Sequence, residues 1–200
     1  MGGQLSEDWL ERLRARDHEA FNQFVRLYHA AAFRLAQRLL RHADDAQEVT
    51  QDAFLAAYEG IAGFEQRASP RTWLLAITYR KALDRLKRRA SEGHLLSGVL
   101  DDDALWKIAQ RVEHLTDWGE NPEHHFSRAE FTERLNSALG RLPAESRAVF
   151  ELRDVQGLST LEAAQVLGMS EGALRVRLHR VRQYLMSELQ SLFGGKGVQP

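Results

Sequence analysis

The stretch GLSTLEAAQVLGMSEGALRVRLHR, residues 157–180, decides the fold class of this chain. Ser159 and Glu162 have the spacing of a capping box, in which each side chain accepts a hydrogen bond from a backbone amide at the start of a helix. Gly168 stands where the chain needs a left-handed turn, and Ser170 is placed to cap the helix that follows. These signals together predict a helix-turn-helix.

The second helix of this motif carries cations away from its apolar stripe. The stripe repeats at helical spacing through Leu174, Leu178, Val181 and Leu185, so we expect it to face the core. The side chains off the stripe include guanidinium groups, which read guanine edges or hold phosphates. The candidate DNA contacts are Arg175, Val176, Arg177, His179, Arg180 and Arg182. An ordinary helical hairpin with a solvated arginine face is the alternative.

Helical spacing of apolar residues dominates the rest of the chain, and most of the 14 glycines fall between the periodic segments. We therefore expect an all-α fold. In the first half, the predicted helices start at Ser6, after Asp17, at Asp44 or Asp45, and at Ser69-Pro70. In the second half they cover Phe126 to about Leu139, Pro143–Val155, Thr160–Leu167 and Glu171 to about Leu192.

Composition divides the chain into two small helical domains, 1–89 and 122–193, joined by an acidic linker at 90–121 and followed by a flexible tail at 194–200. In the linker, Gly, Ser, His and acidic residues replace the regular apolar pattern. Four apolar residues nevertheless keep helical spacing there, so we expect a short amphipathic helix that docks on a domain or a partner. They are Leu105, Ile108, Val112 and Leu115.

The composition excludes several classes of protein. The chain has 200 residues, 44% of them hydrophobic, and a net charge of -1, which suits compact domains rather than disorder. It has no cysteine, which excludes disulfide scaffolds and thiolate metal sites. It shows neither a signal sequence nor an apolar run of about 18 residues, the length that a membrane span needs. We expect a soluble cytoplasmic protein without direct membrane insertion.

The neutral sum hides blocks of one sign. Residues 43–59 contain five acidic and no basic residues, 66–89 contain eight basic and one acidic, and 92–120 contain seven acidic and two basic. A solvated helix face normally mixes the signs, so these blocks indicate separate partners, a polyanion for the basic block and a basic surface for the acidic ones. Chance clustering on a solvated surface is the alternative for the basic block.

The residues of an enzyme site are missing from the sequence. The eight histidines include no His-Glu-x-x-His pair, and the adjacent His124 and His125 would point about 100° apart on a helix. No phosphate-binding glycine loop precedes a lysine, and no Gly-x-Ser-x-Gly occurs. We therefore expect no catalytic site, metal or cofactor. A helical hydrolase or metal enzyme with a site assembled across helices is kept as a second alternative.

From about Asp17 to Leu189 the chain resembles the extracytoplasmic-function (ECF) sigma factors, the two-domain initiation subunits of bacterial RNA polymerase. Residues 158–182 resemble the family's reader of the -35 promoter element, which implies that Arg175, Val176, His179 and Arg180 face that element. Residues 44–58, DDAQEVTQDAFLAAY, resemble the helix that grips the polymerase clamp helices. Its implied polar contacts are Asp45, Glu48, Gln51 and Asp52.

Phe64 and the run SPRTWLLAI at 69–77 resemble the loop and helix with which such factors open the -10 region and capture an unstacked base. The implied -10 contacts are Phe64, Arg67, Arg71, Trp73, Arg80, Lys81 and Arg88. The chain departs from the family pattern at Gln66-Arg67 and at Arg80, so the base preference does not carry over. For Trp73, a place in the core is the alternative.

The resemblance implies a sigma factor that is a monomer when free, binds the clamp helices of the β′ subunit and the β flap of core RNA polymerase, and directs initiation at specific promoter DNA. It also implies control by an anti-sigma factor. The acidic linker would run through the polymerase's basic channel, although a plain solvated spacer has the same composition. The main alternative is a stand-alone helix-turn-helix regulator that binds an operator as a dimer.

Overall fold

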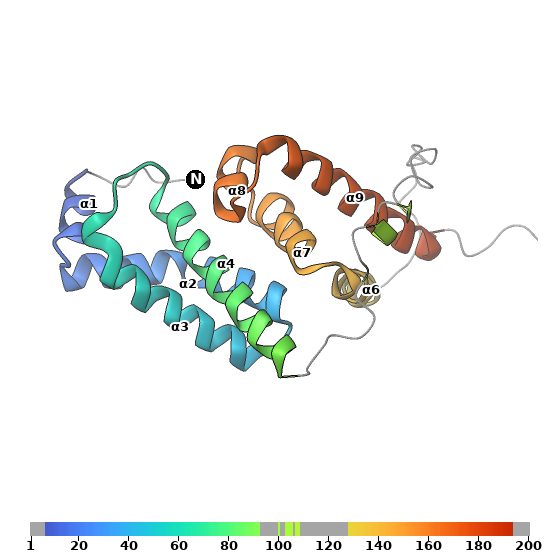
Figure 1. Ribbon diagram of the computed structural model, residues 1–200, viewed down its shortest axis with the longest axis horizontal. Helices are drawn as coiled ribbons and strands as arrows, with labels where there is room; N and C mark the ends of the chain where they lie inside the picture. Colours follow the sequence, from blue (N-terminus) through green and yellow to red (C-terminus); the bar gives the residue numbers. More distant parts are fainter. Residues whose placement is uncertain (1–6, 93–99, 101–102, 106, 109–127, 194–200) are drawn as a thin grey trace, which may run out of the picture.

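A computed structural model of the chain describes residues 7–92, 100, 103–105, 107–108 and 128–193. The described residues are helical apart from short connections and contain no strand. This confirms the predicted all-α class. The helices form two groups, one from each half of the chain, that lie side by side (Figure 1). The Ser6 cap, most of the linker and the 194–200 tail lie outside the described residues.

The N-terminal group begins with helices whose starts are set by local hydrogen bonds. The Asp17 carboxylate accepts the Ala20 amide at 2.8 Å, and the Ser69 hydroxyl accepts the Thr72 amide at 3.1 Å. Both caps confirm the predicted starts. The elements are α1 (Glu7–Arg14), α2 (His18–Leu40), α3 (Ala43–Gly60), the 3₁₀ turn η1 (Ile61–Gly63) and α4 (Pro70–Ser91).

The C-terminal group contains the predicted helix-turn-helix. Ser159 and Glu162 form the capping box, Gly168 adopts a φ of 66°, and the Ser170 hydroxyl accepts the Ala173 amide. The elements are α6 (Arg128–Arg141), α7 (Ala144–Phe150), the π-helical turn η2 (Glu151–Val155), α8 (Thr160–Leu167) and α9 (Glu171–Phe193). The turn at Gly168 is left-handed, as its residue type predicts.

Two helix boundaries differ from the prediction. α3 begins at Ala43, one or two residues before the predicted start at Asp44 or Asp45, because the side chain of His42 accepts the amide of Asp45. The helix predicted over 143–155 changes to a π-helical turn after Phe150. A π turn keeps the same apolar residues and only shifts the hydrogen-bond register, so the apolar spacing does not mark it.

Part of the predicted linker helix docks on the C-terminal group. Residues 103–105 and 107–108 are helical, and Leu105 is buried among apolar side chains of α6 and α9. This segment therefore packs on a domain, one of the two outcomes expected for it. Val112 and Leu115, from the same predicted stripe, lie outside the described residues.

One apolar core runs across both helix groups. α4 packs along α8, and α2 packs along α7 and η2. The linker composition indicates two domains but not that they touch. We call this packing the closed arrangement. Its shared cluster includes Leu35, Leu39, Leu75 and Tyr79 from the N-terminal group and Val149, Leu152, Val166 and Leu178 from the C-terminal group.

A buried cation joins the two groups. Arg147 of α7 is 1% exposed, and its guanidinium donates to the carbonyls of Arg38 at 3.0 Å, of Leu39 at 2.9 Å and of Leu142. The first two carbonyls belong to the last turn of α2, where a helix carries partial negative charge. Burial, together with the charges of Arg41 and Arg38, lowers the pKa of Arg147 to about 10, so it remains protonated at neutral pH.

A second arginine makes the reciprocal contact. Arg41, which ends α2 in a left-handed conformation, donates to the carbonyl of Gly140 at 2.8 Å. A Cβ at Gly140 would lie 2.7 Å from the Arg41 guanidinium, so the close approach needs glycine or a displaced arginine. Each group therefore satisfies carbonyls at a helix end of the other.

The π-helical turn η2 and Gln156, which follows it, supply further polar contacts across the boundary. Glu151 is 1% exposed and accepts from Arg38 at 3.2 Å and from the side chain of Gln156 at 3.2 Å. The Gln156 amide also donates to the carbonyl of Ala31 in α2, at 3.0 Å. These buried groups are thus paired across the boundary, as burial of polar groups requires.

Arg147→Ala is expected to lower the free energy of unfolding by about 2–4 kcal/mol, because it leaves carbonyls unsatisfied at a buried boundary. Urea denaturation followed by circular dichroism measures this loss. Arg141→Ala is the matched control, since Arg141 is half exposed and pairs with Glu188 at 3.4 Å. The control should change stability by less than about 0.5 kcal/mol. Equal losses for the two variants would contradict the role given to Arg147.

Candidate nucleic-acid interface

Local hydrogen bonds hold the helix-turn-helix. The amide of Ser159 donates to the Glu162 carboxylate at 2.8 Å, and the amide of Glu162 donates to the Ser159 hydroxyl at 3.2 Å. The hydrogen bonds from Ser159 lower the pKa of Glu162. Behind the motif, Leu174 and Leu178 are buried in the shared core. The opposite side of α9 is therefore the side open to a partner.

Four predicted -35 contacts lie on or beside that open side. Val176 is 50% exposed, Arg175 and His179 are exposed, and Arg180 is half-buried. Arg175 pairs with Glu171 one turn earlier, at 2.8 Å. An exposed apolar side chain among guanidinium groups suits base edges that include a thymine methyl.

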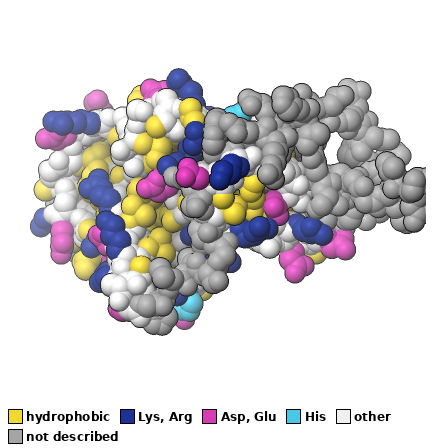
Figure 2. Space-filling view, turned by 45° about the vertical axis from the view of Figure 1, so that its right-hand side comes forward, with side chains coloured by type: hydrophobic (Ala, Val, Ile, Leu, Met, Phe, Trp, Pro, Cys, Tyr) yellow, Lys and Arg dark blue, Asp and Glu magenta, His cyan; other side chains and the backbone are white. Residues whose placement is uncertain are grey.

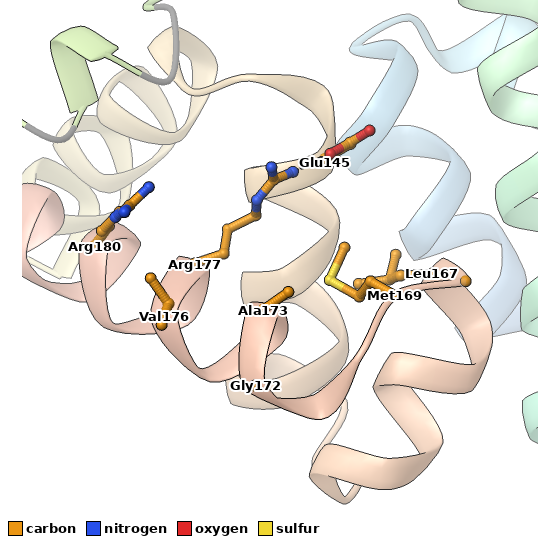
Figure 3. Close-up of a pocket in the computed structure, with 9 residues that line it drawn as sticks. Glu145, Leu167, Met169, Gly172, Ala173, Val176, Arg177 and Arg180 are labelled. Carbon is orange, nitrogen blue, oxygen red and sulfur yellow. Dashed lines mark hydrogen bonds and ion pairs between the residues drawn. The ribbon is translucent and has the colours of Figure 1, made fainter.

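The other two predicted -35 contacts are engaged inside the C-terminal group. Arg177 pairs with Glu145 at the start of α7, and Figure 3 shows the two side chains pointing toward each other. Arg182 binds Asp154 of η2 through two hydrogen bonds, at 3.0 and 2.5 Å. The hydrogen bond to Asp154 raises the pKa of Arg182. These two arginines therefore tie α9 to α7 and η2.

A hollow of about 460 Å³ lies beside α9 (Figure 3). One end is apolar and the other is cationic. Small residues of α9 form its floor, so a partner can approach the helix backbone there. The lining residues are Glu145, Leu167, Gly168, Met169, Gly172, Ala173, Val176, Arg177 and Arg180.

A second hollow, of about 210 Å³, lies at the loop before α4. Phe64 is 5% exposed, and its ring centroid lies 5.1 Å from that of Trp73, which is half-buried. Trp73 thus packs against the core and also lines the hollow. A place in the core and a contact with -10 DNA are therefore compatible for this residue. Aromatic walls with a cation at the rim suit an unstacked base. Gly63, Glu65, Arg67 and Ala68 complete the lining.

Two arginines beside this hollow have partners. Arg67 is exposed and pairs with Glu65 at 2.6 Å. Arg71 donates to the backbone carbonyl of Gln156 at 3.0 Å and to its side-chain oxygen at 3.3 Å. Arg71 is therefore occupied by the C-terminal group in the closed arrangement.

The free positive charge of the basic block lies further along α4. Arg80, Lys81 and Arg88 belong to the predicted -10 set, and Lys87 is a further cation of the basic block. None of these four side chains makes a hydrogen bond or ion pair within the described part of the chain. Cations without internal partners are free to bind phosphates.

Asp45, a predicted polymerase contact, is 8% exposed and faces α4. Arg85 donates to one carboxylate oxygen at 2.5 and 3.1 Å, and Arg89 donates to the other at 3.0 Å. Burial acts to raise the pKa of Asp45, but the hydrogen bond and charge of Arg85 and the charge of Arg89 outweigh it, so the pKa lies below its ordinary value. Asp45 therefore joins α3 to α4.

The other three predicted polymerase contacts are more accessible. Glu48 has a side chain 58% exposed, which reaches Arg85 at 3.2 Å. Gln51 is exposed and Asp52 half-buried, and neither side chain has a polar partner among the described residues. These three residues belong to the accessible polar surface of α3, which also includes Asp44, Gln47 and Glu59.

The acidic and basic helices partly neutralise each other, because α3 and α4 are neighbours. Arg85 and Arg89 bind carboxylates of α3, so the two fields inferred from the sequence are weaker at their boundary. On the face drawn in Figure 2, acidic and basic side chains lie next to each other. The charged side chains without an ion pair therefore contribute most of the electrostatic potential that a binding partner encounters.

Among the described residues, the histidines show no grouping that suggests a metal centre. No three His, Asp or Glu side chains gather as a metal site would need within the part of the chain that is described. His29 instead lies in near-parallel stacking with Phe33 and Phe54, with centroids 6.2 Å away in each case. None of the described helices combines the length and hydropathy needed to span a bilayer.

Known proteins match both helix groups. The family model for Sigma-70 region 2 matches residues 24–92, and the model for Sigma-70, region 4 matches residues 132–185. The ECF RNA polymerase sigma factor SigM of Mycobacterium tuberculosis is 31% identical over 92% of this chain and 85% of its own length. The chain belongs to the ECF sigma factor family. SigW of Bacillus subtilis, also an ECF sigma factor, is 26% identical over 92% of this chain and 96% of its own.

Solved structures agree with this assignment. The sigma factor described here matches CnrH, solved in complex with the cytosolic domain of CnrY, with a TM-score of 0.64, 26% identity, and coverage of 92% of this chain and 96% of that one. RpoE of Bartonella quintana, solved with the anti-sigma factor NepR, shares the fold with a TM-score of 0.61 and 22% identity. The match covers 85% of this chain and 96% of the RpoE chain. The resemblance drawn from the sequence motifs is confirmed.

Asp45→Asn in this sigma factor is expected to cost about 1–3 kcal/mol of stability at pH 7 and much less at pH 3. Because folding lowers the pKa of Asp45, its contribution is present above the unfolded value and is lost as the pH falls through the folded value. Urea denaturation across this range measures the difference.

Asp44→Asn is the control for this experiment, because Asp44 is exposed and has no partner within the described residues. The free energy of unfolding of Asp44→Asn should equal that of the parent protein at every pH. A loss in Asp45→Asn that stays constant from pH 7 to pH 3 would show that the charge of Asp45 is not what holds α3 to α4.

Proposed function

We propose that this sigma factor reads two promoter elements, one with each helix group, and binds core RNA polymerase through α3. Residues 1–89 form the domain for polymerase binding and for -10 recognition and melting, and residues 122–193 form the -35 domain. Residues 90–121 are the acidic linker. The observation that carries the proposal is the combination of an exposed cationic recognition helix in one group with an aromatic hollow beside unpaired cations in the other.

The -35 element is read by the open side of α9. A helix of this kind enters the major groove, where guanidinium groups bind guanine and apolar groups contact thymine methyls. Arg177 and Arg182 act differently, since their ion pairs hold α9 against α7 and η2. The residues that contact bases or adjacent phosphates are Arg175, Val176, His179 and Arg180.

The -10 element is opened at the hollow before α4. Trp73 and Phe64 form the wall against which an unstacked base is held, and Arg67 lies at its rim. Arg80, Lys81 and Arg88 hold phosphates of the separated strand, to which Lys87 adds its charge. Arg71 becomes available only when it leaves Gln156.

Core polymerase is bound by the accessible surface of α3, through Glu48, Gln51 and Asp52. In this proposal the clamp helices of the β′ subunit bind this surface and the β flap binds the C-terminal group, as the family resemblance implies. Asp45 supports the surface from behind, because its carboxylate is taken by Arg85 and Arg89.

Reading both elements requires the two groups to separate. A compact chain of 200 residues has a radius of gyration of about 16 Å. At about 3.4 Å per base pair, positions -35 and -10 lie about 85 Å apart on straight DNA. The closed arrangement therefore represents the free factor, and the polymerase holds the groups apart. Free sigma factor then binds promoter DNA weakly, because its two sites cannot act together.

Control by an anti-sigma factor follows from the same geometry. A protein that binds the closed arrangement keeps the two groups together and withholds them from the promoter. CnrH and RpoE, which this chain resembles in fold, were each solved with a protein partner. We place the sigma factor in the cytoplasm, because core polymerase works there. We also propose that it is a monomer when free.

The alternative is a stand-alone regulator in which the helix-turn-helix binds an operator as a dimer. Mixing the purified protein with sigma-free bacterial core polymerase separates the two functions. Co-migration on a sizing column, with discrete start sites on genomic DNA, supports the sigma role. A dimeric footprint without polymerase, and no association with core, would contradict it.

Asp52→Lys is expected to weaken core polymerase binding about tenfold, because it reverses a charge that has no internal partner on α3. Fluorescence anisotropy with labelled sigma factor measures the affinity. Glu11→Lys is the matched control, since Glu11 is exposed on α1, outside the proposed surface. Core affinity that survives Asp52→Lys unchanged would remove α3 from the interface.

Arg175→Ala is expected to reduce binding to the -35 element by about 1–3 kcal/mol, with core binding unchanged. Competition between cognate and -35-substituted promoters in the holoenzyme measures the effect, which should disappear on the substituted promoter. Arg26→Ala, which removes an exposed cation of α2, controls for the change in net charge. If both variants lost affinity equally for both promoters, Arg175 would contact no base.

A further inference from the structure

α1 lies outside the residues matched by the region 2 model, yet it is part of the N-terminal core. Trp9 is 6% exposed and Leu13 is fully buried. Both belong to an apolar cluster that includes Ile61 and Phe64, which lie in the 59–64 segment leading to the -10 hollow. The helix therefore touches the segment that carries one wall of the hollow.

Two arginines at the end of α1 bind the two ends of that segment. The Nε of Arg14 donates to the carbonyl of Phe64 at 3.0 Å. Arg16 donates to the carbonyl of Glu59 at 2.8 Å, and its guanidinium carbon lies 5.7 Å from the centroid of the Tyr58 ring. Arg16 itself has a φ of 59°, a conformation uncommon outside glycine, which ends α1 and directs the chain into α2.

Both acceptors are carbonyls at helix ends. Glu59 lies in the last turn of α3, and Phe64 follows η1 directly. Such carbonyls have no partner within their own helix and carry partial negative charge, so an arginine is a strong donor to them. The two hydrogen bonds hold residues 59–64 at both ends, just before the Phe64 ring meets Trp73.

We propose that Arg14 and Arg16 are positioning residues for -10 recognition: they hold the 59–64 segment so that Phe64 and Trp73 present a preformed wall to the unstacked base. Neither arginine needs to touch DNA. A segment that is already ordered loses less conformational entropy when the base enters, which strengthens binding. The inference rests on the proposed function of the hollow, and it extends the -10 site to a helix that the family match does not cover.

The test uses holoenzyme reconstituted with bacterial core polymerase and a fluorescent single-stranded oligonucleotide that carries the -10 element. Arg14→Ala is expected to weaken binding of this oligonucleotide about tenfold, the equivalent of one charge-assisted hydrogen bond. Binding to core and to -35 duplex should stay within about twofold. Arg12→Ala is the matched control and should bind like the parent protein. Arg12 lies on α1, as Arg14 does, and its exposed side chain pairs with Asp17, the N-cap of α2.

Conservative and exposed variants separate positioning from folding. Arg14→Lys keeps a cationic donor and should recover binding to within about threefold of the parent. Arg16→Ala, at an exposed side chain, provides the same comparison if Arg14→Ala loses its fold, with an expected loss of about fivefold.

Unchanged -10 binding in both alanine variants would overturn the proposal. Equal losses for -10, -35 and core binding would overturn it as well, because they would show only a general defect in folding. If the parent holoenzyme itself neither bound the oligonucleotide nor initiated transcription, the proposed function would fail, and the inference with it.

Discussion

Arg147 donates to three backbone carbonyls, and the closed arrangement of the two helix groups depends on those hydrogen bonds. A buried guanidinium is costly unless its donors are satisfied, and helix-end carbonyls are costly unless they accept. The C-terminal group therefore supplies the guanidinium donors, and the end of α2 supplies two of the three carbonyl acceptors. Arg41 and Gly140 make the same exchange in the opposite direction. Because α2 also packs against α3 and α4, this contact connects the two helices for which we propose polymerase and -10 binding with the helix-turn-helix.

The closed arrangement divides the functional residues into those ready for a partner and those withheld. The outer side of α9 and the polar surface of α3 are exposed, whereas Arg71 is bound to Gln156 and the apolar side of α4 is covered by α8. A partner that binds α3 thus meets its surface before the groups separate. In the proposed function, separation of the two groups would expose Leu75 and Tyr79, and the polymerase contacts would have to compensate for this apolar area. The order of events that we propose follows from this accessibility.

Electrostatic pairing between neighbouring helices decides which charges act on a partner. The sequence shows an acidic block and a basic block, but Asp45, Arg85 and Arg89 neutralise one another where α3 meets α4. The charges without a partner within the described residues include Asp44 and Asp52 on α3 and Arg80, Lys81, Lys87 and Arg88 on α4. Fewer charges are therefore available to distinguish a protein partner from DNA than the charges of the two sequence blocks suggest.

The all-α class, the helix-turn-helix and most helix starts could be predicted from local sequence, because caps such as Ser69 and Ser159 and the turn at Gly168 act within a few residues. The sequence also placed Leu174 and Leu178 in the core, since helical spacing marks the apolar side. The folded structure was needed to show that Asp45 faces α4, that Arg177 and Arg182 hold α9 against α7 and η2, and that Arg14 donates to the carbonyl of Phe64. Periodicity shows which side of a helix is polar, whereas the partner of each charge depends on which helices become neighbours in the folded chain.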